Sequence, residues 1–234
     1  MDKQIRQRVV GMFNNVDGQL AVQSAQGIGA NPPANPGGTG VTTSSPTVSQ
    51  ENTPKTARTR KVAILLENGY NFPEVNQVME ALKNAGVHME IISKNLGMVT
   101  SVDGQQLEVN KNYLSAGSIN YDAVYVAGGR QNVDTLINQG DSVHFINEAF
   151  RHAKAIGATN EGVDLLATSQ IQVVKLADPQ TYAQLFSEMG VVTIRNAADM
   201  GNADQESYFS HEFIKAIAQH RHWIRQGQKE MIPA

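Results

Sequence analysis

The first 26 residues carry one apolar stripe with helical spacing. Large apolar residues recur three or four positions apart, which places them on one face of a helix: Ile5, Val9, Met12, Phe13, Val16 and Leu20. Asn14–Asn15 and Asp17–Gly18 predict a break into two short helices, with Asp17 as the N-cap of the second. Residues 1–26 are therefore predicted to be a helical segment that packs on a partner, which need not lie within this chain.

Residues 27–60 have a different composition, dominated by Gly, Pro, Ser, Thr and Asn. After Ile28 the only large apolar residues in this stretch are Val41 and Val48. Such a segment buries too little apolar surface to offset the entropy cost of ordering it. The pattern predicts a flexible linker over 27–60 and a folded domain over 61–234.

The folded domain opens with a strand–helix–strand unit. Lys61–Leu66 is a continuous apolar run, as expected of a strand that is buried on both faces. Pro73 suits the first turn of a helix over 74–85, and Gly86 suits its C-terminal cap. A second strand follows at 87–93, so the unit predicts a parallel sheet.

Alternation of strands and helices continues to the end of the chain. The patterns predict a hairpin over 98–109 that turns at Asp103–Gly104. They also predict strands at 121–127, 171–176 and 191–195, and helices at 131–137, 142–153, 179–189 and 205–226. This order predicts an α/β fold of flavodoxin-like, doubly wound type, with a mostly parallel sheet and helices on both faces.

The stretch from Lys154 to Leu166 has the order strand, turn and helix. Ala155–Ala158 is a short apolar run that predicts a buried strand, and a helix is predicted to begin at Gly162. A tight turn between such elements lifts one side chain above the edge of the sheet, as in a nucleophile elbow. The residue at the apex is predicted to be Asn160, whose amide is not a nucleophile.

Two glycines, Gly128 and Gly129, follow the strand at 121–127. Glycine lets an oxyanion or phosphate approach the backbone N–H groups closely, although a tight turn alone would also require it. Together with the elbow, Gly128, Gly129 and Asn160 are predicted to line a relic oxyanion hole or ligand cleft. Glu161 and Asp164 stand in the first turn of the helix, where its dipole favours acids without any catalytic role.

Composition excludes several classes of chemistry. The chain has no cysteine, which removes disulfides, thiolate catalysis and cysteine-ligated metals. Its net charge is −3 and it has no basic stripe, so nucleic acid is a poor candidate partner. It has neither a membrane-length apolar run nor a secretory signal, so we expect a cytoplasmic protein.

The six histidines are scattered and no metal site is predicted. The loop Glu67–Phe72 lacks the hydroxyl donors of an FMN site, so FMN is disfavoured.

From Arg60 onwards the chain resembles the superfamily of class I glutamine amidotransferases, DJ-1 and PfpI. The resemblance lies in residues 61–66, 121–130 and 154–166. In active members the elbow reads approximately Ala-Ile-Cys-His-Gly, so Asn160 stands in place of the cysteine and Glu161 in place of the histidine. The acid that partners that cysteine comes from the first loop, where the corresponding position resembles Asn71. The resemblance thus implies the fold with a degenerate site.

The whole chain also resembles the C-terminal portion of large-subunit, HPII-type catalases. The likeness lies in residues 7–17, which are similar to the helical end of the catalase core, in the domain that follows, and in residues 220–223 and 232–234. In that family the haem-ligating segments would lie before Met1, so this chain is expected to hold no cofactor and the haem to belong to the parent. The resemblance implies an accessory role in stability, in assembly of the homotetramer with the catalase core, or in chaperone-like holding of unfolded proteins under oxidative stress.

Two other hypotheses stay open at the level of sequence. The chain is alternatively a DJ-1/PfpI-type glyoxalase, deglycase or hydrolase with a non-cysteine nucleophile such as Thr159. A third hypothesis is a module that binds a small molecule in the cleft above Gly128, Gly129 and Asn160.

Overall fold

The computed structural model describes residues 2–41, 43, 45–49, 53–171, 173–180, 184–195 and 203–233. The chain divides into two compact units, Met1–Pro54 and Lys55–Ala234. Among the described residues, none of the helices combines the length and apolar character needed to cross a bilayer.

The first unit is a pair of helices, α1 (Lys3–Asn14) and α2 (Gly18–Ile28). As predicted, the break falls at Asp17, whose carboxylate caps α2 by accepting a hydrogen bond from the N–H of Leu20 at 2.7 Å. Among the described residues of this unit, the buried apolar cluster consists of Val10, Ala21 and Ala25. Such a small core contributes little stability to the unit.

Part of the predicted linker folds back along these helices. Gln7 exchanges two hydrogen bonds with the backbone of Asn31, at 3.0 and 3.2 Å. Asn14 holds the N–H of Gly37 at 2.9 Å and the carbonyl of Asn35 at 3.1 Å. Residues as far as Gly38, which forms a β-bridge with Asp17, therefore belong to the first unit. The sequence pattern did not reveal this because amide side chains bind backbone groups here, and such contacts leave no apolar pattern.

The second unit begins before the predicted boundary at Arg60. Ala57 is buried, and the N–H of Thr59 donates to the carbonyl of Gly86 at 2.8 Å. Arg60 lies 3.9 Å from Asp122 as an ion pair. Residues 55–60 therefore belong to the folded domain and not to the linker.

Limited trypsin digestion tests this boundary. We expect the first cut that separates the two units to follow Lys55, which is exposed, and cuts after Arg58 and Arg60 to be slower because both residues pack on the domain. Mass spectrometry of early fragments is the measurement. Faster cleavage after Arg60 than after Lys55 would restore the boundary that the sequence predicted.

A seven-stranded sheet forms the centre of the second unit, in the order β5-β2-β1-β6-β7-β9-β8. All neighbouring strands pair in parallel except β8, which is antiparallel to β9. The strands are β1 (Lys61–Leu65), β2 (His88–Ser93), β5 (Lys111–Asn112), β6 (Ala123–Val126), β7 (Ala155–Thr159), β8 (Phe186–Glu188) and β9 (Val191–Ile194). A separate hairpin, β3 (Gly97–Thr100) and β4 (Gln106–Val109), turns near Gly104 as predicted.

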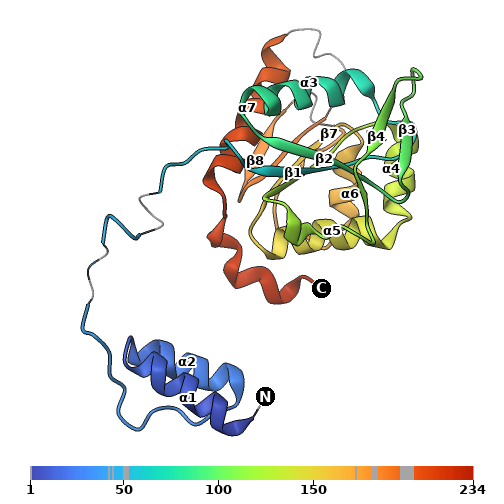
Figure 1. Ribbon diagram of the computed structural model, residues 1–234. Coiled ribbons are helices and arrows are strands. Elements are labelled where there is room, and N and C mark those ends of the chain that lie inside the picture. Colours follow the sequence, from blue (N-terminus) through green and yellow to red (C-terminus); the bar gives the residue numbers. More distant parts are fainter. Residues whose placement is uncertain are drawn as a thin grey trace. The chain divides into compact units, whose positions relative to one another are not determined.

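Helices cover both faces of this sheet (Figure 1). They are α3 (Phe72–Asn84), α4 (Arg130–Ile137), α5 (Gly140–Arg151), α6 (Gly162–Thr168) and α7 (Ala203–Gln219). Alternate residues of β1 enter different cores: Val62 and Ile64 join α3 and α7, whereas Ala63 and Leu65 join α4, α5 and α6. The predicted doubly wound, flavodoxin-like fold is confirmed.

Two predicted elements near the C-terminus are wrong, and a third, the last helix, ends earlier than predicted. The described part of 171–176 contains no strand, and within 179–189 the structure has β8 where a helix was expected, with residues 181–183 outside the described part. The last helix was predicted to reach Gln226 but ends at Gln219. His220 there has a φ of 69°, and a 3₁₀ segment follows over Trp223–Met231. A left-handed residue cannot continue an α-helix, so the chain turns at this point.

Candidate functional site

The predicted elbow forms where β7 passes into α6. Asn160 lies between them with a φ of 48°, a left-handed conformation that Asn tolerates better than most residues. A Cβ at Gly162 would lie 2.5 Å from the carbonyl oxygen of Val126, so only glycine allows α6 to begin this close to β6. The structure thus places Asn160 at the apex of the turn, as predicted.

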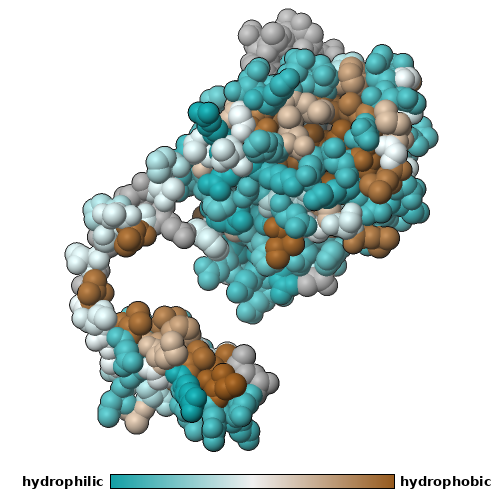
Figure 2. All heavy atoms as spheres, viewed as in Figure 1, coloured by the Kyte–Doolittle hydropathy of each residue, from teal (hydrophilic) through white to brown (hydrophobic). Residues whose placement is uncertain are grey.

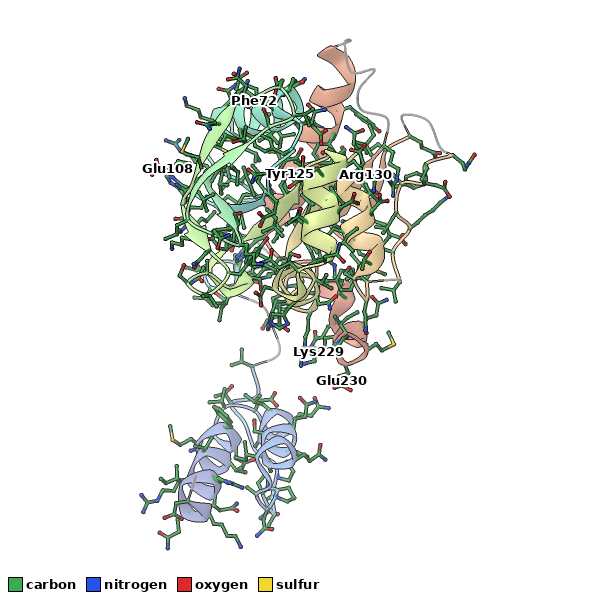
Figure 3. The ribbon with its side chains drawn as sticks, turned by 90° about the vertical axis from the view of Figure 1, so that its right-hand side faces the viewer. Phe72, Glu108, Tyr125, Arg130, Lys229 and Glu230 are labelled. Atoms are coloured by element: carbon green, nitrogen blue, oxygen red, sulfur yellow. The ribbon has the colours of Figure 1, made fainter. Side chains whose placement is uncertain are left out.

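The centre of the site is a buried carboxylate, Glu74, in the first turn of α3. Its Oε1 accepts a hydrogen bond from the N–H of Gly128 at 2.8 Å, and another from the Thr159 hydroxyl. Its Oε2 accepts from Nδ2 of Asn160 at 2.7 Å. Tyr125, in the interior of the domain (Figure 3), places its hydroxyl 3.4 Å from Oε1 and 2.8 Å from the Thr159 hydroxyl. Glu74 therefore joins α3, β6 and the elbow.

Burial raises the pKa of Glu74 above its ordinary value, and the nearby negative charge of Glu161 raises it further. Hydrogen bonds from Thr159, Gly128 and Asn160 act in the opposite direction because they stabilise the carboxylate. The net shift is upwards, so desolvation is the dominant effect. A carboxylic acid held in this way suits proton exchange with an ionisable residue at the apex, which the amide of Asn160 is not.

The position assigned to the acid partner of the elbow is corrected by this geometry. Asn71 is the N-cap of α3, and its side chain accepts from the N–H of Glu74 at 3.4 Å. The carboxylate that contacts Asn160 belongs to Glu74, one helical turn further on. An acid in the first turn of a helix has an ordinary explanation in the helix dipole, so no local pattern distinguishes Glu74 as a site residue.

The two glycines of the predicted oxyanion hole already have partners. The N–H of Gly128 donates to Glu74, and the N–H of Gly129 donates to Oε2 of Glu161 at 2.9 Å. The chain's own carboxylates thus take the two donors that an oxyanion would need. Gly128, Gly129 and Asn160 lie close together, as predicted. Glu74 and Glu161, however, occupy the N–H groups that a bound oxyanion would need.

Gly129→Ala is expected to destabilise the second unit by about 2–3 kcal/mol. Gly129 has a φ of 105°, and an added Cβ would collide with the carbonyl oxygen of Gly69 and lie 2.8 Å from the Cα of Tyr70. Gly140→Ala is the matched control, because nothing beyond its chain neighbours and its own helix backbone lies within 4 Å of its Cβ position. Urea unfolding followed by tryptophan emission measures both. Equal stability of the two variants would contradict the close packing of this loop.

A second charged group supports the elbow from the other side. Asp164 of α6 pairs with Arg195, which follows β9, and with Arg130 at 2.9 Å. Arg195 is nearly buried, and it also donates to the carbonyl of Asn160 at 3.4 Å and to that of Ala177 at 2.8 Å. Arg130 lies at the start of α4 (Figure 3). These contacts fix the turn, and the sequence had assigned Asp164 only to the helix dipole.

Thr159, the alternative nucleophile, is fully buried. Its hydroxyl lies between Glu74 and Tyr125. A nucleophile must reach its substrate, so this position suits a structural hydroxyl. Among the described residues, no group of three or more His, Asp or Glu side chains is placed to hold a metal ion.

Comparison with known proteins points to one family. A family model for the C-terminal domain found in long catalases matches residues 58–227. Catalase-2 of Bacillus subtilis strain 168 is 42% identical over 224 residues, which make up 96% of this chain and 29% of that protein. Catalase HPII of Mycobacterium avium is 33% identical over 233 residues, or 99% of this chain and 32% of that protein. The chain spans less than a third of the length of these relatives.

Solved structures with the same fold are DJ-1-like. The chain resembles oxidized DJ-1 of Toxoplasma gondii with a TM-score of 0.59 and 13% identity, covering 75% of this chain and 100% of that one. A ThiJ/PfpI domain protein from Brachyspira murdochii gives a TM-score of 0.60 and 13% identity, covering 68% and 97%. At this identity the likeness shows the fold alone, which is the one expected from the sequence.

Proposed function

The chain belongs to the family of C-terminal domains found in long catalases, and on this premise we propose that it is a catalytically silent accessory domain of such an enzyme. The observation that supports the absence of catalysis is that the elbow has no nucleophile and its N–H donors are already occupied. An amide stands at the apex, and Glu74 and Glu161 occupy the N–H groups of Gly128 and Gly129. The domain then acts by contact with the rest of the enzyme, in stability and assembly of the oligomer.

The first unit offers a surface for that contact. Figure 2 shows apolar surface on this unit, where α1, α2 and the turn between them leave large apolar side chains exposed: Ile5, Met12, Phe13, Val16 and Leu20. Exposed apolar surface gathered on one small unit marks interaction sites. We assign it to the catalase core, because the relatives extend well beyond the length of this chain.

Haem belongs, in this proposal, to the core of the parent enzyme, which would convert hydrogen peroxide to water and oxygen. Tyrosinate ligation of haem needs a phenol that is open to iron. The hydroxyls of Tyr70, Tyr121 and Tyr125 are hydrogen-bonded inside the second unit, to Gln105, Glu90 and Thr159 respectively. These three phenols are therefore not open to iron.

A chimera tests the accessory role. The corresponding C-terminal part of Bacillus subtilis Catalase-2 is replaced by this chain, and peroxide decomposition after heating is compared with that of the core alone. We expect the chimera to retain its oligomer and more of its activity. The isolated chain mixed with hemin is expected to decompose no more peroxide than hemin does. A tight stoichiometric haem complex of the isolated chain, or a chimera no more stable than the core, would refute the proposal.

Substitutions on the exposed apolar surface sharpen this experiment. Met12→Gln and Val16→Thr change side chains that are 67% and 57% exposed, so they leave the isolated chain's stability almost unchanged. In the chimera they are expected to accelerate loss of activity on heating. Exposed Val48→Thr, outside the two helices, is the control.

The same exposed apolar surface supports a second role, chaperone-like holding of unfolded proteins. Exposed apolar side chains bind the apolar segments of unfolded proteins as well as the core of the enzyme. Light scattering of a heat-denatured protein measures this. Suppression of aggregation by the wild type, and weaker suppression by the Met12→Gln/Val16→Thr variant, is the expected result. Equal suppression by both would assign the effect to another surface.

A further inference from the structure

A pocket of about 550 Å³ lies in the second unit, away from the elbow. It is formed where α5 ends, where the chain enters β7, and where the 3₁₀ segment begins. The residues that define its chemistry are Ile119, Arg151, Lys154, Arg221, Trp223 and Lys229. Figure 3 shows Lys229 on the C-terminal segment.

The pocket is strongly cationic although the whole chain is acidic, with a net charge of −3. Four of its lining side chains are Lys or Arg, and none of the described residues that line it is acidic. Arg151 and Arg221 have carboxylates only at 3.6 and 3.8 Å, from Glu148 and Asp122. Within the described part of the chain, Lys154 and Lys229 have no carboxylate within 4.0 Å. The positive charge of the pocket is therefore incompletely neutralised.

Lys154 is the least ordinary of these groups, because it is only 3% exposed. An ammonium has three N–H donors, and the described residues supply one acceptor, the carbonyl of Ser118. Buried charges in proteins are normally paired, so we infer that a bound anion supplies the partner of this ammonium. Burial, assisted by Arg221, lowers the pKa of Lys154 to about 8, although Asp122 and Glu148 oppose that shift.

A flat apolar surface adjoins the cations. Trp223 is 63% exposed and Ile119 is 83% exposed at this pocket. An exposed indole beside cationic groups offers a stacking surface for a ring that carries an anionic substituent. The volume is in the range of pockets that hold small organic ligands.

We propose that this pocket binds a small phosphate-bearing organic anion, with its phosphate on Lys154 and Arg221 and its ring on Trp223. Lysine and arginine are the usual protein partners of phosphate, and a concave site with a buried ammonium favours a small ligand over a flat protein surface. The inference does not depend on the role proposed for the elbow or for the first unit.

Trp223 is the only tryptophan of the chain, so its emission reports directly on this pocket. The full chain is titrated at low salt with ADP, with inorganic phosphate and with adenosine. ADP is expected to change the emission saturably, phosphate to bind more weakly, and adenosine to bind least. Added salt should weaken ADP binding because it screens the exposed cations.

Two variants locate the phosphate. Lys154→Met and Lys229→Met are each expected to weaken ADP binding, Lys154→Met by roughly tenfold. Lys229 is exposed, so its variant stays informative if Lys154→Met fails to fold. Lys83→Met, an exposed change on α3, is the matched control and should leave binding unchanged.

The pH dependence gives a separate readout. Binding an anion favours the protonated ammonium, so affinity should fall as pH rises from 7 through about 8 and beyond. This dependence should disappear in Lys154→Met. The charged and titratable groups around Lys154 are Arg151, His152, Arg221, Lys229, Asp122, Glu148 and, behind its carbonyl, Arg225.

Three results would overturn the proposal. They are the absence of a saturable change with ADP, equal ADP affinity of the wild type and Lys154→Met, and binding of an acidic peptide in the absence of ADP binding. The last would assign the pocket to a protein partner.

Discussion

Replacing Glu74 by alanine is expected to lower the free energy of unfolding by about 3–4 kcal/mol at neutral pH. The substitution removes the acceptor of the buried N–H of Gly128, and one partner each of the Thr159 hydroxyl and the Asn160 amide. It also opens a cavity at the place where α3, β6 and β7 meet. Urea unfolding followed by the emission of Trp223, which lies in the second unit, measures the loss.

Glu80→Ala is the matched control for this change. Glu80 lies on the same helix, but it is exposed, and its carboxylate accepts a hydrogen bond only from Asn76 among the bonds described for it. Its substitution should cost at most about 0.5 kcal/mol. Comparable losses for Glu74→Ala and Glu80→Ala would show that the Glu74 cluster contributes little.

Glu74→Gln keeps the shape of the Glu74 side chain but removes its charge, so it tests the two contributions to stability separately. The pKa of Glu74 is raised in the folded protein, so folding favours its protonated form. The part of its stability contribution that depends on protonation is therefore complete below its ordinary pKa of 4.5 and is lost as pH rises through the raised value, whereas its hydrogen bonds and packing remain. We expect the free energy of unfolding of Glu74→Gln to be at least that of the wild type near pH 7. It should fall relative to the wild type as pH falls towards 4.5. A wild-type advantage that grows with rising pH would contradict the direction of the shift.

The second large effect is expected at the elbow. Asn160→Cys alone should gain little activity on methylglyoxal or activated esters. Glu161 adds a negative charge beside the apex and opposes formation of a thiolate. Its carboxylate also holds the N–H of Gly129. The combined change Asn160→Cys/Glu161→His removes both obstacles and adds a base, while Glu74 already supplies the acid.

The double variant should therefore exceed Asn160→Cys by about 100-fold in rate. Single-turnover assays of both variants and of the wild type are the measurement. Adding Asn71→Glu should bring no further gain, because Asn71 caps α3 and does not supply the acid partner. Appreciable activity of the unmodified chain would refute the silent elbow. Inactivity of the double variant at full stability would show that more than these two positions has been lost.

The order of elements could be predicted because each one depends on local pattern. Lys61–Leu66 was recognisable as a strand buried on both faces, and the strand is observed over Lys61–Leu65. The elbow was recognisable because its strand, its turn at Asn160 and its helix from Gly162 are contiguous in sequence. Backbone periodicity and turn chemistry act over a few residues, so one sequence suffices to read them.

Contacts between distant residues were decided only by the tertiary structure. Glu74 and Asn160 are 86 positions apart, and they meet because the parallel register of β1, β6 and β7 brings three loops to one edge of the sheet. The end of α7 is a similar case. The pattern continued to Gln226, but His222 donates its N–H to Ala153 and Arg225 is buried against the carbonyls of Met189 and Lys154. Hydrogen bonds to fixed backbone groups elsewhere outweigh continuation of a helix, and no local pattern encodes them.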